Sequence, residues 1–110
     1  MSTKSTTKST KSTKAETISA NFEGHGRQTV TYRETLDLGG QKLRIIIKSD
    51  SYIFQCGARI ERWDGTQWHE VHHLVPSRME TKVVGASSIS AETFAADRAL
   101  LVALAREIVA

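Results

Sequence analysis

One short segment of the chain contains residues whose types and spacing could do chemistry. Residues 69–73 read His-Glu-Val-His-His and satisfy the H-E-x-x-H pattern, with His69 and His73 four positions apart and Glu70 beside the first histidine. In zinc peptidases a helix brings two such histidines onto one face, where they bind the metal, and the glutamate acts as the general base. The segment therefore raises the hypothesis of a small zinc hydrolase.

The surrounding residues favour a strand for this segment. Asp64-Gly65 is a hairpin-turn signal, and the run 66–75 that follows it is short and rich in aromatic and β-branched residues. On a strand the two histidines stand roughly 13 Å apart, which is too far for one ion held by bonds of about 2 Å. No third ligand is distinctive downstream, although Glu80 and Glu92 exist. We therefore predict no metal site, and the zinc hydrolase remains an alternative.

Two smaller arrangements could also carry chemistry. Cys56 could pair with His73 across neighbouring strands as thiolate and imidazolium, but no third member or oxyanion hole accompanies them, and we interpret both as partly buried core residues. Glu34 is the one charge on the apolar side of its run, where it could be a carboxylate with a raised pKa. An inward-pointing charge on an edge strand also prevents unwanted strand pairing, and we favour that interpretation. The sequence predicts no catalytic residue and no cofactor.

All of the net positive charge lies in the first fourteen residues. Residues 1–14 hold four lysines and no acid, whereas residues 15–110 hold eleven Lys and Arg against twelve Asp and Glu. A nucleic-acid-associated protein that uses this basic arm is the alternative function, and its binding would weaken steeply with salt. The nucleic-acid-binding candidates are Lys4, Lys8, Lys11 and Lys14.

Composition bounds the class of protein. The Lys-Ser-Thr repeat has no apolar residue between Ser2 and Lys14, so we predict a disordered tail over residues 1–20 and a single domain over residues 21–110. Cys56 is the only cysteine, which is typical of a cytoplasmic protein. The chain has no secretory-signal pattern and no apolar run of the ~20 residues that cross a bilayer, so we expect no membrane partner.

The domain is predicted to be α+β. Apolar residues alternate with polar ones in four runs separated by turn signals, which predicts a four-stranded antiparallel β-meander. A C-terminal α-helix, capped by Ser90, should pack on one face of this sheet. The predicted strands cover residues 29–38, 41–48, 51–63 and 66–75, and the helix covers residues 91–109.

Two-residue turns predict how the strands pair. In the middle hairpin they pair Leu43 with Cys56, Ile45 with Phe54, and Ile47 with Tyr52. In the last hairpin they pair Ile60 with His69, Ala58 with Val71, and Cys56 with His73. A four-residue last loop would instead set Trp63 opposite Trp68. It would also oppose Glu61 and Glu70, two like charges, so we prefer the shorter turn.

Two surfaces indicate binding to protein. Residues 99–105 of the predicted helix are apolar without a polar break, so one sheet face cannot cover them, and Leu100 and Val102 belong to the surplus. A homodimer or another protein would cover that surplus. The outer face of the sheet is expected to carry further protein-binding candidates, because Trp and Arg are favoured anchors of interfaces. These candidates are Trp63, Trp68, Arg59, Glu61 and His72.

Three segments carry a resemblance to a known group. Residues 49–55 (SDSYIFQ), 58–63 (ARIERW) and 68–72 (WHEVH) resemble stretches of small uncharacterised phage and prophage accessory proteins. No catalytic residues are assigned to that group. The resemblance implies a small protein that acts by binding, such as a virion component or an inhibitor of a host system. We therefore predict a non-enzymatic protein-interaction module.

Overall fold

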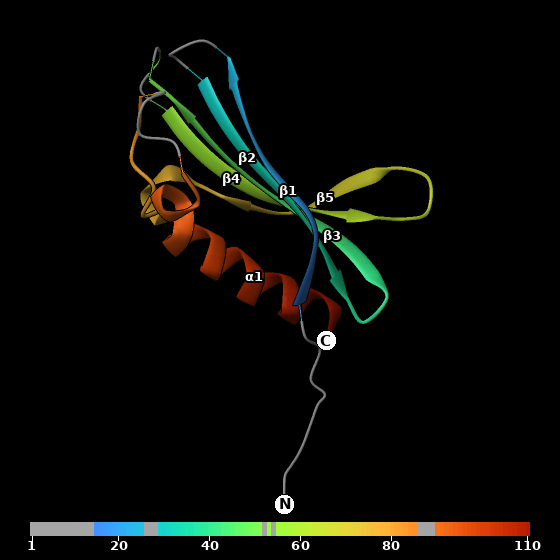
Figure 1. The fold of residues 1–110 in the computed structure, drawn as a ribbon. Coiled ribbons are helices and arrows are strands. Elements are labelled where there is room, and N and C mark those ends of the chain that lie inside the picture. The colour runs from blue at the N-terminus through green and yellow to red at the C-terminus, as the bar shows by residue number, and fades with distance from the viewer. Residues whose placement is uncertain (1–14, 26–28, 52, 54, 86–89) are drawn as a thin grey trace, which may run out of the picture.

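The chain folds into a sheet with a helix along one side. The computed structural model describes residues 15–25, 29–51, 53, 55–85 and 90–110, and in them one antiparallel sheet has the order β1-β2-β3-β4-β5 (Figure 1). The strands are β1 (Ala15–His25), β2 (Thr29–Leu38), β3 (Gln41–Asp50), β4 (Gln55–Trp63) and β5 (Trp68–Leu74). The helical elements are η1 (Pro76–Arg78), η3 (Ala91–Phe94) and α1 (Ala95–Val109).

The predicted meander and C-terminal helix are confirmed by β2 to β5 and α1. The structure adds β1, which pairs antiparallel with β2 and shifts register between Thr17 and Ser19. The boundary predicted for the tail, at residue 20, falls within this strand. The four candidate lysines of the tail lie outside the described residues.

The core lies between α1 and the face of the sheet that it covers, which we call the inner face (Figure 1). Period-two alternation places the apolar residues of β2, β3 and β4 on this face, where α1 removes them from water. Ser90 caps the helical segment as predicted, since its Oγ accepts a hydrogen bond from the Thr93 amide at 3.3 Å. The core consists of Val30, Tyr32, Leu36, Leu38, Leu43, Ile45, Ile47, Ala58, Ile60, Leu74, Met79, Phe94, Leu101 and Ala105.

The register predicted between β3 and β4 is wrong. β3 continues through Asp50 and β4 begins at Gln55, so four residues connect them and Ser49, not Leu43, stands opposite Cys56. Ile45 consequently faces Ile60, and both are fully buried. The predicted and observed registers differ by an even number of residues, so both put the same side chains on the inner face.

The register predicted between β4 and β5 is also wrong. The loop has four residues, Trp63 faces Trp68, and Glu61 faces Glu70. Asp64 holds this loop, because its Oδ1 accepts hydrogen bonds from the amides of Thr66 and Gln67 at 2.7 and 2.8 Å. A second shift of register follows between Ile60 and Glu61, so β5 contains one extra residue there.

The segment after β5 follows the sheet back to the helix. Pro76 begins η1 one residue after β5 ends, in agreement with the prediction that its missing N–H stops the strand. In the segment 79–85 the Val84 amide donates to Ser49 Oγ at 2.9 Å, which ties this connection to β3. Among the described residues no helix is long and apolar enough to cross a membrane.

Candidate interaction surface on the outer sheet face

The face of the sheet opposite α1, called here the outer face, is covered by no described helix (Figure 1). Strand pairing and the alternation of side chains determine which residues belong to it. The turn of the β4–β5 hairpin projects away from α1 (Figure 1). The outer-face residues of β3, β4 and β5 include Arg44, Ile46, Lys48, Gly57, Arg59, Glu61, Trp63, Trp68, Glu70 and His73.

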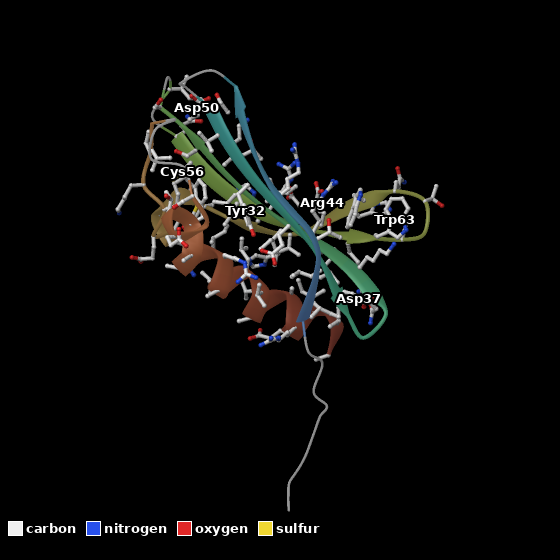
Figure 2. All side chains as sticks on the ribbon, viewed as in Figure 1. Tyr32, Asp37, Arg44, Asp50, Cys56 and Trp63 are labelled. Carbon is white, nitrogen blue, oxygen red and sulfur yellow. The ribbon has the colours of Figure 1, made fainter. Side chains whose placement is uncertain are left out.

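Two tryptophans and an arginine are in contact on this face. The rings of Trp63 and Trp68 lie 5.3 Å apart between centroids and are tilted by 56°. The guanidinium carbon of Arg44 stands 4.3 Å from the centroid of the Trp68 ring, a cation–π contact. Figure 2 shows Trp63 on the projecting hairpin and Tyr32 between the sheet and α1. The aromatic pair therefore adds stability to a hairpin end that α1 does not cover.

Glu61 joins two arginines into the same cluster. Its Oε1 accepts a hydrogen bond from Arg44 Nε at 2.9 Å, and its Oε2 accepts one from Arg59 Nε at 2.9 Å. Burial raises the pKa of the Glu61 carboxyl, but the hydrogen bonds from the two arginines outweigh burial and the pKa is lowered. Two cations around one carboxylate offset the repulsion from Glu70, which explains why the four-residue loop is tolerated.

A hollow of about 220 Å³ lies on the outer face next to this cluster. Gly57 contributes no side chain there, and it stands opposite Lys48 of β3. The lining residues come from β3, β4, β5 and the loop before β4. They are Ile46, Lys48, Asp50, Ile53, Gln55, Cys56, Gly57, Ala58, Arg59, Glu70 and His73.

The structure brings together four of the predicted outer-face residues, Trp63, Trp68, Arg59 and Glu61. It does not place His72 with them. The extra residue in β5 sets His72 opposite Ile60, on the inner-face side, and brings His73 to the outer face opposite Arg59. A single-residue shift exchanges the faces of all later side chains, and the sequence has no signal for it.

The two helix candidates lie on the other layer. Val102 packs against the core and is half-buried, whereas Leu100 is 40% exposed. Val102, predicted to belong to the apolar surplus, thus packs against the core together with Leu104 and Ile108. Of the two helix candidates, only Leu100 is therefore an exposed large apolar residue.

The H-E-x-x-H segment lies on a strand, as predicted. His69 faces Arg62, and its Nε2 lies 2.5 Å from Asp64 Oδ2 at the hairpin turn. His73 lies toward the other end of β5, and no group of three His, Cys, Asp or Glu residues that could hold a metal occurs within the described ranges. The described residues therefore do not contain two histidines on one face of a helix, the arrangement that binds zinc in H-E-x-x-H peptidases.

Cys56 and Glu34 have structural surroundings. Cys56 stands opposite Ser49, with its Sγ 3.5 Å from the Thr81 carbonyl oxygen, and it is not paired with His73. β2 lies between β1 and β3 and is therefore not an edge strand, so the interpretation that Glu34 protects a sheet edge is wrong. Its carboxylate, 1% exposed, accepts hydrogen bonds from Arg98 Nε at 2.5 Å and Nη2 at 2.7 Å. An ion pair between α1 and the sheet explains this buried charge.

Comparisons with protein-family models, with curated proteins and with solved structures found no match to this chain. The surface is therefore interpreted from its own residues. Sequence reasoning missed Arg44 and Lys48, although both share the outer-face parity of β3 and alternate with the buried Leu43, Ile45 and Ile47. The alternation that predicted the core thus also contained the signal for these two cations.

Proposed function

We propose that this chain is a non-enzymatic protein-interaction module that binds a partner protein through the outer face of its sheet. The observation that carries the proposal is the connected cluster of Arg44, Trp68, Trp63, Glu61 and Arg59 on a face that no described helix covers. Tryptophan and arginine are enriched among the residues that dominate binding energy at interfaces. Contacts within the cluster hold these side chains in place before binding, which lowers the entropic cost of association.

The resemblance of three segments to phage and prophage accessory proteins supports the same kind of role. Two of those segments, residues 58–63 and 68–72, belong to the hairpin that carries the cluster. A virion component or an inhibitor of a host system would act by binding and would need no catalytic residue. A second copy of the chain is the other protein that this face could bind.

A pair of charge reversals tests the proposal. Glu70 is exposed on the outer face opposite Glu61, so Glu70→Lys changes the surface while removing a like-charge contact. Glu107→Lys is the matched control, because Glu107 is exposed on α1. A partner is first retained by the immobilised full chain and identified, and its affinity for each variant is then measured by calorimetry.

We expect Glu70→Lys to change that affinity by about tenfold or more, because a charge at the interface is reversed, and Glu107→Lys to leave it unchanged. Thermal unfolding of both variants checks that each remains folded. Equal affinity of the two variants, or no specific partner and no self-association, would contradict the proposal.

Nucleic-acid association through the N-terminal arm is a second candidate function. The observation that favours it is the concentration of all net positive charge at Lys4, Lys8, Lys11 and Lys14. Such binding would rest on charge alone and would therefore depend strongly on salt.

A further inference from the structure

Gly57 of β4 lines the hollow on the outer face. A Cβ added to Gly57 would meet no atom within 4 Å, and the backbone there does not adopt a positive φ. Backbone geometry therefore does not require glycine at this position. The effect of the missing side chain is open space above the strand, between β3 and β5.

The hollow combines an apolar side with an open mouth. Ile46 is only 3% exposed although no described helix covers its face, and it lines the hollow. Ile53, in the connection before β4, is 52% exposed and lines it as well. An aliphatic group entering the hollow would therefore contact two isoleucines and leave water.

Cations surround the middle of the hollow. Lys48 stands opposite Gly57, is exposed, and forms no ion pair with a carboxylate of the described residues. Arg59, two positions along β4, binds Glu61 through Nε while its side chain stays 41% exposed. His73 faces Arg59 from β5.

Among the described lining residues, the two carboxylates stand toward the ends of the hollow. Asp50 accepts a hydrogen bond from the Ile53 amide at 3.3 Å, and Glu70 lies in the next cross-strand pair, opposite Glu61. The charge pattern along the hollow is therefore acidic, cationic, acidic. A bound anion is favoured at the centre, above Gly57.

We infer that this hollow receives an acidic side chain from an extended segment of the partner protein. The carboxylate lies between Lys48 and Arg59. Aliphatic residues two positions before and after the acidic residue, which share its face in an extended segment, contact Ile46 and Ile53. The inference rests on the proposed function and specifies the chemistry of the partner.

Peptide titration of the isotope-labelled full chain tests the inference. The probe is the capped peptide acetyl-Val-Ser-Glu-Ser-Val-amide, whose two valines share the face of Glu when the peptide is extended, and its control carries Gln in place of Glu. We expect saturable amide shifts centred on Lys48, Gly57 and Arg59, with a dissociation constant on the order of millimolar. The Gln peptide should bind about fivefold more weakly or worse, because it lacks the charge.

Two pairs of variants locate the binding. Gly57→Val fills the hollow in a strand position that tolerates a side chain, and Gly85→Val is its control at a second glycine with equally open surroundings. Lys48→Gln removes the unpaired cation, and Lys42→Gln removes an exposed lysine of the same strand outside the hollow. We expect Gly57→Val and Lys48→Gln to weaken binding by about fivefold or more and the controls to leave it unchanged.

Equal binding of the two peptides, shifts centred away from Gly57, or no saturable shift at about 10 mM peptide would overturn the inference. Its failure is distinguishable from failure of the proposed function. If the affinity of an identified partner changes with Glu70→Lys but is unaffected by Gly57→Val and Lys48→Gln, the interaction surface stands and the acidic-side-chain inference falls.

Discussion

At the scale of single residues, the buried pair of Glu34 and Arg98 shows how this small domain joins its two layers. The carboxylate is almost fully buried, and the guanidinium reaches it from α1 with two hydrogen bonds. The hydroxyl of Tyr32 also donates to Glu34. A buried carboxylate is stable only while these donors are present, so the pair fixes the position of the helix on the sheet.

Removal of the Arg98 guanidinium should therefore destabilise the fold. We expect Arg98→Ala to lower the free energy of unfolding by about 3 kcal/mol, because Glu34 is left buried without its cation. Arg98→Lys should recover only part of this loss, since an ammonium cannot donate the two parallel hydrogen bonds. Urea unfolding measures both variants, and a loss below about 0.5 kcal/mol for Arg98→Ala would contradict the account.

Because the pKa of Tyr32 is raised in the folded chain, the free energy of unfolding should fall as the pH becomes alkaline. Burial, together with the hydrogen bond to Glu34, raises the pKa of Tyr32 from 10.0 to about 12. The contribution is fully present below pH 10.0 and is lost as the pH rises through about 12, because only the unfolded chain ionises in this interval. We expect Tyr32→Phe to show a smaller decline in unfolding free energy over this range than the parent chain. Equal slopes would show that Tyr32 does not titrate in this way.

At the scale of elements, Asp97 connects α1 to the segment that returns from β5. It is 1% exposed and accepts hydrogen bonds from the amides of Glu80 at 2.7 Å and Thr81 at 2.5 Å. These bonds satisfy two amides of residues 79–85, a stretch without regular secondary structure. The helix thereby orders a connection that forms no ladder of its own.

Asp97→Ala should consequently destabilise the protein by about 2 kcal/mol, since the two amides lose their acceptor. Hydrogen exchange at Glu80 and Thr81 should become faster in this variant, while exchange at the centre of β3 follows only the global loss of stability. Glu92→Ala, which removes an exposed acid on η3, is the control. Unchanged exchange at Glu80 and Thr81 would rule out the role assigned to Asp97.

The elements themselves could be predicted because alternation and caps are local signals. Four strands and the helix after Ser90 follow from such patterns, and β1 carries a similar one, with Ile18, Ala20 and Phe22 alternating with polar residues. The pairing could not be predicted in the same way. Registers that differ by an even number of residues bury the same side chains, so the pattern does not select among turn lengths.

The part of the candidate site that depends on strand parity could be predicted, whereas the part that depends on register could not. Trp63, Trp68, Arg59 and Glu61 follow from strand parity alone, and they lie together as expected. The contact of Arg44 with Trp68 and Glu61 depends on the true registers. The exchange of His72 for His73 depends on an extra residue within β5, which only three-dimensional pairing reveals.

At the scale of the whole molecule, α1 covers one face of a five-stranded sheet, and no described helix covers the other face (Figure 1). The part of the inner face that α1 covers is mainly apolar, apart from the buried Glu34–Arg98 pair and Ser49, whereas the outer face combines tryptophans with opposite charges. Such a composition is typical of a protein interface. The division of the two faces is the basis of the proposed function.

The N-terminal arm allows a separate prediction. Deletion of residues 1–14 removes four lysines and leaves a domain with one more acidic than basic residue, counting Asp, Glu, Lys and Arg. We expect the deletion to abolish any binding to a DNA or RNA oligonucleotide at low salt, because that binding is electrostatic. Binding to a protein through the outer face should remain. Electrophoretic mobility shift and calorimetry measure the two, and oligonucleotide binding that survives the deletion would assign it to the folded domain.

The most direct test of the central claim is site-specific photo-cross-linking to the partner. Two variants each carry one photo-reactive amino acid. In the first it replaces Thr35, which stands opposite Arg44 on the outer face, and in the second it replaces Ala103, which is exposed on α1. The account predicts that illumination links the partner to the chain from position 35 and not from position 103. Cross-linking from position 103 alone would place the interaction on the helix and contradict the account.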